Sequence, residues 1–398
     1  MQHSTHRILT THVGSLPRPE SLVTLYRQCA SVDALAPALK SAVGDVVRRQ
    51  REAGVDVVND GEFGKATKSD VDYGAWWSYV YERLDGFEPR EGAALGRNYG
   101  PTRSKDRRRF SAFYQSGMPL AGGTAAKTEQ ASATERLAGL ACTRPIRYVG
   151  DQLIRRDAAH LKAALNGRGE DAFMSAVSPA TLQILRNEYY STPEEYTWAL
   201  ADAMHEEYRA IVDAGFLLQI DDPALVDLYD WWFSEGDDLA SYRKWAVFQV
   251  EALNHALRGI PEDRVRFHIC WGSWHGPHSA DLELKDVADL LVTINAQAYS
   301  IEAGNVRHAH EWKVWRDVVR LPAGKMLIPG VVSHATNVLE HPELVADRII
   351  QYADVVGREH VIAGTDCGLG GRIHPDLAWA KLEVLAEGAA LASSRLWP

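Results

Sequence analysis

The chain has 398 residues, of which 46% are hydrophobic and 24% are charged, and its formal net charge is −10 at pH 7. A chain of this length can bury a sizeable hydrophobic core without disulfide or metal cross-links. The negative net charge disfavours nucleic-acid or anionic-membrane partners. No apolar run approaches the roughly 18 residues that span a bilayer, and the N-terminus lacks the pattern of a signal peptide. Four cysteines in so long a chain do not make a disulfide framework. We therefore expect a cytoplasmic enzyme with no nucleic-acid and no membrane partner.

Short β-branched apolar runs alternate along the chain with longer amphipathic stretches. The runs are ILTTHV (8–13), VDVVND (55–60), AFMSAV (172–177), FLLQID (216–221), VRFHIC (265–270), AYSIE (298–302), MLIPGVV (326–332) and VIAGTD (361–366). Eight strands with helices between them favour a single α/β domain over residues 1–398, a (β/α)8 TIM-type barrel. A doubly wound open sheet is the alternative.

Two of the amphipathic stretches carry clear helix signals. In residues 198–215, apolar residues recur at helical spacing and Gly215 supplies a C-cap. Residues 343–357 show the same spacing, with Pro342 just before them and Gly357 at their end. Both stretches are predicted to be helices of the barrel.

Residues 66–165 break this alternation. They hold the basic run RSKDRRR (103–109), a stretch of small residues (120–141) and one strand-like segment, PIRYVG (145–150). We interpret them as a long insertion after the second strand that folds over one face of the barrel as a lid. The basic run is expected to be a solvated loop, and an anion-binding lid is its alternative.

Polar residues gather where the apolar runs end. The motifs are HVGS (12–15), NDGE (59–62), IDD (220–222), HIC (268–270), IE (301–302), SH (333–334) and TDC (365–367). In a (β/α)8 barrel the carboxyl ends of all strands meet at one mouth, where active sites lie. The sequence therefore predicts an active site built from these motifs.

Four of these residues have the side chains that zinc prefers. His268 and Cys270 stand two apart on a strand, so that both side chains point to the same face. Cys367 and Glu302 end two other strands, and imidazole, thiolate and carboxylate groups suit a four-coordinate zinc site. Cys29 and Cys142 have no histidine nearby and are interpreted as structural.

The strand-end motifs resemble those of a known family. The segments TTHVGSLPR (10–18), NDGEFG (59–64), QIDDPAL (219–225), HIC, SIE (300–302), PGVVSH (329–334) and TDCGL (365–369) resemble the catalytic barrel of cobalamin-independent methionine synthase. The likeness to epoxyalkane:coenzyme M transferase, a smaller member of that superfamily, is closer and extends through GAWW (74–77), HICWGSWHGPH (268–278), RHAHEW (307–312) and GLGGRIHP (368–375). The resemblance covers nearly the whole chain, and we expect no counterpart of the additional N-terminal barrel that methionine synthase of this type has.

The resemblance implies a zinc-activated alkyl transfer to a thiol. A free thiol has a pKa of about 8.5, and zinc delivers its thiolate at neutral pH. The family's fixed zinc ligands fall on His268, Cys270 and Cys367, and its labile fourth ligand falls on Glu302. The family's proton donor to the leaving group falls on His334, a role that suits a histidine. A structural hydrogen bond at the strand end is the alternative for His334.

The resemblance also implies substrate-binding residues. Glu62 and Asp221 fall on the two acids that hold the amino group of homocysteine in methionine synthase, and Ser15 falls near the substrate carboxylate. Two acids suit an ammonium group and repel a sulfonate. The alternative is that Asp221 and Asp222 orient the neighbouring loop.

Aromatic and basic residues supply further candidates. Trp271 and Arg307 are predicted to contact substrate, Arg307 through an anionic group, and a solvated loop is the alternative for Arg307. The tryptophans Trp76, Trp77 and Trp274 are candidates for the pocket of the alkyl donor, although lone aromatics more often pack in a core. Residues 175–190 contain no tryptophan where methionine synthase stacks one on the pterin, which disfavours folate.

Three kinds of function remain at this point. The leading hypothesis is a zinc-dependent S-alkyltransferase that opens an epoxide with coenzyme M. The close alternative is methyl transfer to homocysteine from methyltetrahydrofolate or another methyl donor. A zinc-dependent lyase or hydrolase, with water as the fourth ligand, is the alternative of another class, and a structural zinc would need four protein ligands. The partners are then a small thiol and an alkyl donor, and an oligomer is compatible with the sequence.

Overall fold

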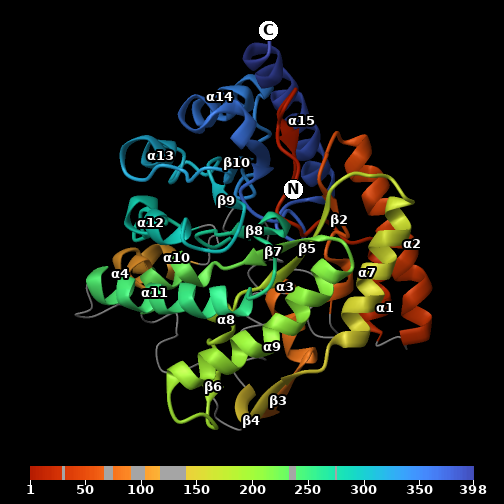
Figure 1. Cartoon of the computed structure of the whole chain (residues 1–398), viewed down its shortest axis with the longest axis vertical. Helices are drawn as coiled ribbons and strands as arrows, with labels where there is room; N and C mark the ends of the chain where they lie inside the picture. Colours follow the sequence, from red (N-terminus) through yellow and green to blue (C-terminus); the bar gives the residue numbers. More distant parts are fainter. Residues whose placement is uncertain (29–31, 67–74, 91–103, 117–139, 233–238, 274–275) are drawn as a thin grey trace.

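The computed structural model describes residues 1–28, 32–66, 75–90, 104–116, 140–232, 239–273 and 276–398 (Figure 1). Each of the eight predicted runs contains a strand. The strands of the main sheet are β1 (Leu9–Thr10), β2 (Val58–Asn59), β5 (Ala172–Val177), β7 (Leu217–Asp221), β8 (Val265–His268), β9 (Ala298–Glu302), β10 (Met326–Val332) and β11 (Ile362–Thr365).

The main sheet is a closed parallel barrel. Its strand order is β1-β11-β10-β9-β8-β7-β5-β2, and every neighbouring pair is parallel. A parallel bridge between Thr11 and Val57 joins the two ends, and Val57 N–H donates to Thr10 O at 3.0 Å. The order therefore follows the chain around a ring, which confirms the predicted TIM-type barrel over the doubly wound sheet.

Helices alternate with the strands, as the sequence predicts. The helices are α1 (Glu20–Arg27), α2 (Val32–Glu52), α3 (Ala75–Ser78), α4 (Lys105–Arg109), α5 (Ser111–Gln115), α7 (Asp151–Leu165), α8 (Pro179–Leu182), α9 (Pro193–Asp213), α10 (Ala224–Trp232), α11 (Leu239–Ala256), α12 (Ala288–Leu291), α13 (Val314–Asp317), α14 (Pro342–Val356) and α15 (Pro375–Leu396). The predicted helix at 198–215 lies in α9, which begins earlier because the Thr192 hydroxyl accepts from Glu195 N–H and Pro193 takes the first position. The predicted helix at 343–357 is α14. No helix in these ranges is long and apolar enough to cross a bilayer.

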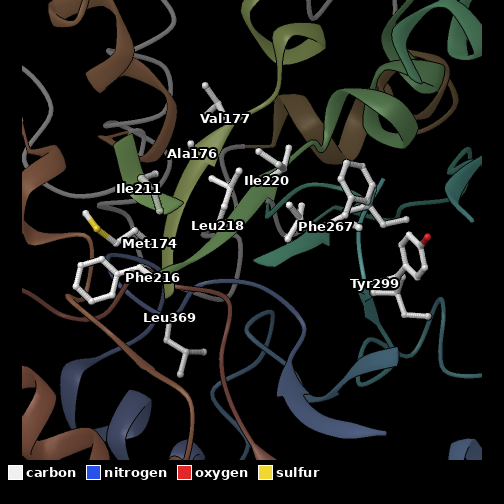
Figure 2. Packing of buried hydrophobic residues seen from close by; sticks show 14 of the residues in the cluster. Met174, Ala176, Val177, Ile211, Phe216, Leu218, Ile220, Phe267, Tyr299 and Leu369 are labelled. Carbon is white, nitrogen blue, oxygen red and sulfur yellow. The ribbon is translucent and has the colours of Figure 1, made fainter. Parts of the chain in front are cut away.

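The strands are buried on both faces. Figure 2 shows Met174 of β5 and Leu218 and Ile220 of β7 among the side chains of the large hydrophobic cluster, which also contains Ile211 of α9. On the inner side, the guanidinium of Arg266 lies 4.1 Å from the ring centroid of Phe173. Burial lowers the pKa of Arg266 to about 9, and its Nη1 donates to Thr11 Oγ1 at 2.9 Å. A packed interior of this kind leaves room for a site only at a mouth of the barrel.

The segment 66–165 contributes two of the three strands of a second, smaller sheet. Strands β3 (Leu84–Pro89) and β4 (Leu140–Tyr148) pair antiparallel, and β6 (Arg186–Asn187) pairs parallel to β4. These strands lie together at the bottom of Figure 1, and β4 packs on α9. The strand predicted at 145–150 lies in β4, and α7 packs between α2 and α9 as an outer helix of the barrel.

The rest of the expected lid lies in residues 67–74, 91–103 and 117–139, outside the described residues. From the basic run, residues 105–109 form α4 rather than a loop. The side chain of Ser104 hydrogen-bonds to Asp230, and Asp106 Oδ1 accepts from Ser279 N–H at 2.9 Å. Both contacts anchor α4, whose last three arginines are exposed.

Candidate metal centre

A cavity lies at the carboxyl ends of the barrel strands and opens to solvent. Its wall includes residues from five strand ends: Ser15 after β1, Glu62 after β2, Asp221 of β7, His268 and Cys270 of β8 and its loop, and Cys367 after β11. The structure thus brings together six of the ten residues that the sequence predicts for the site.

Three of these side chains form a group with the geometry of a metal site. The ligand atoms of His268, Cys270 and Cys367 all lie within 4.8 Å of one another, and all three residues are buried. The two sulfurs are 3.8 Å apart. Two thiolates bound tetrahedrally to zinc at about 2.3 Å would lie about 3.8 Å apart. The observed separation therefore fits a zinc ion held by both cysteines.

The histidine of this group is oriented for binding. Ser300 Oγ lies 3.1 Å from His268 Nδ1, and the buried Nε2 atom has no hydrogen-bond partner among the described residues. A buried nitrogen without a partner is costly, whereas metal-binding histidines typically have their other ring nitrogen held by a neighbour. Nε2 is therefore the nitrogen available to a metal.

The two thiols differ in acidity. The hydrogen bond between the sulfurs lowers the pKa of Cys367 well below its ordinary value, and the positive charge of Arg372 adds to this effect. The same hydrogen bond, together with burial, raises the pKa of Cys270. One of the two sulfurs is therefore readily a thiolate, which is the form that binds zinc.

Glu302, the predicted fourth ligand, lies outside the group of three ligand atoms. Its carboxylate is buried and accepts from Trp271 N–H at Oε1 and from Asn305 Nδ2 at Oε2, both at 2.9 Å. Its charge nevertheless contributes to the raised pKa of Cys270. The carboxylate is thus held near the two thiols by the residue that follows Cys270.

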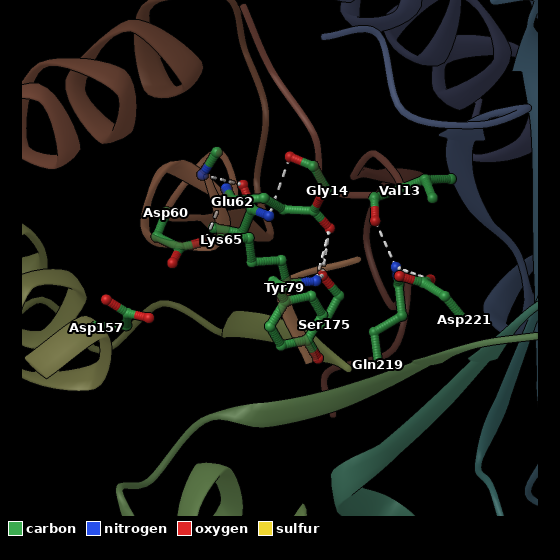
Figure 3. Close-up of polar contacts among 12 residues, drawn as sticks. Val13, Gly14, Asp60, Glu62, Lys65, Tyr79, Asp157, Ser175, Gln219 and Asp221 are labelled. Atoms are coloured by element: carbon green, nitrogen blue, oxygen red, sulfur yellow. Dashed lines mark hydrogen bonds and ion pairs between the residues drawn. The ribbon is translucent and has the colours of Figure 1, made fainter. Parts of the chain in front are cut away.

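Glu62 and Asp221 line the same cavity and are held by different partners (Figure 3). Glu62 Oε1 lies 3.2 Å from Lys65 Nζ, and Ser175 Oγ also donates to it. Asp221 Oδ1 accepts from Gln219 Nε2 at 2.7 Å. Burial raises the pKa of Asp221 to about 7, so that its carboxyl is partly protonated at neutral pH. Of the two acids, Glu62 has a cationic partner in the protein.

Trp271, Arg307 and His334 are not among the described residues that line the cavity. The indole of Trp271 stacks on His308 with ring centroids 3.9 Å apart, and its Nε1 donates to Leu282 O at 2.6 Å, so the ring packs away from the cavity. Arg307 is exposed. His334 is buried, and its charge helps to lower the pKa of Cys367.

The three tryptophans that the sequence suggests for the pocket of the alkyl donor differ in their positions. Trp76 lines the cavity, whereas Trp77 is a partly buried neighbour of the hydrophobic core. Trp274 lies outside the described residues. Trp76 therefore supplies the aromatic surface of the described wall.

Two further wall residues are not predicted from the sequence. Arg372 is buried, and its Nε donates to Ser273 Oγ at 2.9 Å. Asp227 has an enclosed Oδ1 without a hydrogen-bond partner, and burial raises its pKa well above the ordinary value. The segment GLGGRIHP pointed to Arg372 only as part of the resemblance, and nothing in the sequence singles out Asp227 within α10.

Comparisons with known proteins agree with the resemblance. The sequence model of the family described as "Cobalamin-independent synthase, Catalytic domain" matches residues 145–390, which is more than half of the chain. The methionine synthase of Saccharolobus solfataricus is 25% identical over 395 residues, 97% of this chain and 95% of that protein. The 2-hydroxypropyl-CoM lyase of Xanthobacter autotrophicus is 23% identical over 427 residues, 98% of this chain and 96% of that protein.

A solved structure shares the fold. The B12-independent methionine synthase from Shewanella sp. W3-18-1, in complex with selenomethionine, superposes with a TM-score of 0.68 at 18% identity, and the match covers 98% of this chain and 99% of that one. With the closed barrel and the family match over more than half of its length, the chain belongs to the family of the cobalamin-independent synthase catalytic domain.

Proposed function

We propose that the protein is a zinc-dependent S-alkyltransferase, in which a zinc-bound substrate thiolate attacks an electrophilic carbon. The observation that carries this proposal is the group of His268, Cys270 and Cys367, whose ligand atoms lie within 4.8 Å of one another on the wall of a cavity that opens to solvent. Three protein ligands beside an open cavity are typical of catalytic rather than structural zinc.

The residues of the site have separate tasks in this proposal. Zinc, when bound, supplies a Lewis acid that holds the substrate sulfur as its thiolate at neutral pH. His268, Cys270 and Cys367 would hold the ion, and Ser300 keeps the imidazole turned toward the two sulfurs. Glu302 would be the exchangeable fourth ligand, and its carboxylate is held by hydrogen bonds from Trp271 N–H and Asn305 Nδ2.

Opening of an epoxide is the proposed reaction, with coenzyme M as a candidate thiol. The sulfur forms a bond to carbon while the carbon–oxygen bond breaks, and a proton must reach the oxygen. Asp227 lies on the cavity wall, and burial raises its pKa well above the ordinary value, which favours the protonated form. Asp227 is thus a candidate donor on the wall, and His334, which is buried and not among the described wall residues, remains the other candidate. The carboxylate left behind regains a proton from solvent.

Methyl transfer to homocysteine is the second candidate function. It is favoured by Glu62 and Asp221, two acids on one wall that suit an ammonium group. The methionine synthases among the relatives support the same candidate. Against folate as the methyl donor, residues 175–190 contain no tryptophan to stack on a pterin. Tyr189, an aromatic residue of that stretch that could substitute, is half exposed just after β6 and is not a described wall residue.

The test is zinc K-edge X-ray absorption on the purified protein, without thiol and with coenzyme M or homocysteine. We expect two sulfur ligands without thiol and a third sulfur at about 2.3 Å with the true substrate. The variant Cys367→Ser should lose one sulfur in both states. If neither thiol changes the sulfur count, the proposal fails and the hydrolytic or structural alternative takes its place.

A further inference from the structure

A second cavity, which we call the basal cavity, opens to solvent at the end of the barrel opposite the proposed metal centre. One wall comes from residues 315–325, which lead into β10, and the other comes from residues 354–360, which lead into β11. These segments belong to α13 with the loop after it and to the end of α14, and the two helices pack against each other (Figure 1). Because all strands of the barrel begin at one end and finish at the other, the basal cavity is separate from the mouth.

Two of the three lysine and arginine side chains that the structure describes on this wall are paired within the chain. Arg316 Nε donates to Asp317 Oδ1 at 2.7 Å. Lys325 Nζ donates to Ala296 O at 2.7 Å and also forms an ion pair with Glu262. The charges of these two cations are therefore compensated by neighbouring carboxylates.

Arg320 and Asp354 are the other charged residues of the basal cavity. Arg320 belongs to the loop after α13, and Asp354 belongs to the last turn of α14, so that the two charges come from the two walls. Both residues are exposed, and neither side chain forms an ion pair or a hydrogen bond with the other or with another described residue. The basal cavity thus presents one unpaired cation and one unpaired carboxylate.

The rest of the wall is largely apolar. Leu321, Val355 and Val356 line the cavity and pack against the hydrophobic core. Trp315 is 2% exposed and lines the cavity, and its Nε1 has no hydrogen-bond partner among the described residues, nor has Nδ1 of His360. A buried N–H without an acceptor is unfavourable, and an acceptor group bound in the cavity would satisfy it.

We propose that the basal cavity binds a zwitterionic α-amino acid with an apolar side chain. The carboxylate of the ligand binds the guanidinium of Arg320, and its ammonium group binds the carboxylate of Asp354. Its side chain packs on the apolar wall formed by Leu321 and Val355. The planar fork of a guanidinium suits a carboxylate, and a ligand with both charges compensates both unpaired groups at once. The binding is independent of zinc and of the proposed alkyl transfer, because the cavity lies at the other end of the barrel.

The test compares L-leucine with two analogues that each lack one of its charged groups. 4-Methylpentanoate lacks the ammonium group, and 3-methylbutylamine lacks the carboxylate. Their dissociation constants are measured on the full chain by titration calorimetry in the absence of thiol. We expect L-leucine to bind about 10-fold more tightly than either analogue, as hydrogen bonds between charged groups allow.

Each charge is then removed from the protein in turn. Arg320→Met should lower the affinity for L-leucine to that for 3-methylbutylamine and leave the affinity for the amine unchanged. Asp354→Asn should lower it to that for 4-methylpentanoate and leave the affinity for the acid unchanged. Both side chains are exposed, so we expect both variants to fold, which circular dichroism checks.

Two further variants serve as controls. Arg155→Met removes an arginine whose side chain is 81% exposed on α7, outside the basal cavity, and Glu62→Gln removes an acid of the mouth. Both should bind L-leucine as the native chain does. The inference is overturned if the native chain does not prefer L-leucine to the analogues, if Arg320→Met and Asp354→Asn leave its affinity unchanged, or if only Glu62→Gln lowers it. The proposed function is tested separately, by absorption at the zinc edge, so that its failure is distinguishable from these outcomes.

Discussion

Single side chains at the cavity keep their positions through neighbouring side chains, from another strand or from the same turn. Ser300 of β9 holds His268 of β8, and Lys65 holds Glu62. Burial then decides the protonation of several acids, because a carboxylate removed from water is disfavoured. The behaviour of the site with pH therefore depends on burial more than on the residue types that the sequence displays.

Asp60 is a test of this effect on stability. Burial, with the charge of Asp157 adding, raises its pKa to about 6 from the 3.8 of an unperturbed aspartate. Between these values the folded chain binds more protons than the unfolded chain, so stability falls as the pH rises through this window. In the native chain Glu62 N–H donates to Asp60 Oδ1 at 2.9 Å, and the side-chain oxygen of Asn can accept the same hydrogen bond. Asp60→Asn should therefore raise the free energy of unfolding at pH 8 by up to about 3 kcal/mol.

Chemical unfolding at pH 4 and pH 8 measures this change. The increase in the free energy of unfolding should be absent at pH 4, where Asp60 is protonated in the folded chain. Asp45→Asn, on an exposed face of α2, is the control and should leave the pH dependence unchanged. An equal gain at both pH values for Asp60→Asn would contradict the assignment.

Asp227 is predicted to matter only when the leaving group needs a proton. Asp227→Asn should lower kcat with an epoxide by about 10²- to 10⁴-fold, the usual range for general-acid catalysis. With an alkyl iodide, whose leaving group takes no proton, the rate should be within a few-fold of the native rate. Steady-state kinetics with both electrophiles measure this. Equal losses with both would show that Asp227 serves the structure of the cavity and not proton transfer.

At the scale of elements, one buried arginine joins the smaller sheet to the barrel. Arg83, just before β3, lies 2.8 Å from Asp157 of α7 and 3.3 Å from Glu207 of α9, and all three side chains are at most 3% exposed. Tyr79 and Tyr148 hydroxyls donate to the same glutamate at 2.8 Å. Asp157 also pairs with Arg156 at 2.7 Å, so removing the Arg83 cation would leave Glu207 buried without a countercharge, which is strongly unfavourable.

Arg83→Met is expected to lower the free energy of unfolding by about 3–5 kcal/mol. Arg144→Met is the matched control, because Arg144 pairs with Asp85 and Glu88 on the exposed side of the same hairpin and should cost about 0–1 kcal/mol. Denaturant unfolding of both variants measures these two changes in the free energy of unfolding. Equal costs for the two substitutions would mean that the buried network does not fasten this sheet.

At the scale of the whole molecule, the proposed metal links strands that are not neighbours. His268 ends β8, Cys367 follows β11, and β9 and β10 stand between these strands in the barrel. A ligand that binds only the folded chain stabilises it by mass action. Zinc should therefore stabilise the closed barrel as well as serve the reaction.

Free zinc at 100 times its Kd is expected to raise Tm by about 3 °C, because about 2.7 kcal/mol is spread over the unfolding entropy of a chain of this size. Scanning calorimetry on chelator-treated protein, with and without added zinc, measures the shift. Cys367→Ser should remove it. Cys142→Ser, at a buried cysteine of β4 outside the site, should retain it. A shift that persists in Cys367→Ser would locate zinc elsewhere.

Much of the fold and part of the site follow from the sequence alone. All eight strands of the barrel lie within the predicted runs, because a strand buried on both faces has a nearly continuous apolar sequence. The spacing of His268 and Cys270 predicts that both side chains point to one face, and the cavity wall contains both, although β8 ends at His268. The polar motifs after the strands locate the mouth, since parallel strands of a barrel end together.

Other features were decided only by the tertiary structure. The separation of 3.8 Å between Cys270 and Cys367 depends on barrel closure, which no local pattern encodes. Trp271 follows the metal motif directly, yet its ring stacks on His308, because the packing around it determines which way a loop side chain points. Arg372 and Asp227 reach the wall for the same reason: their places depend on how loops from distant parts of the chain meet at the mouth.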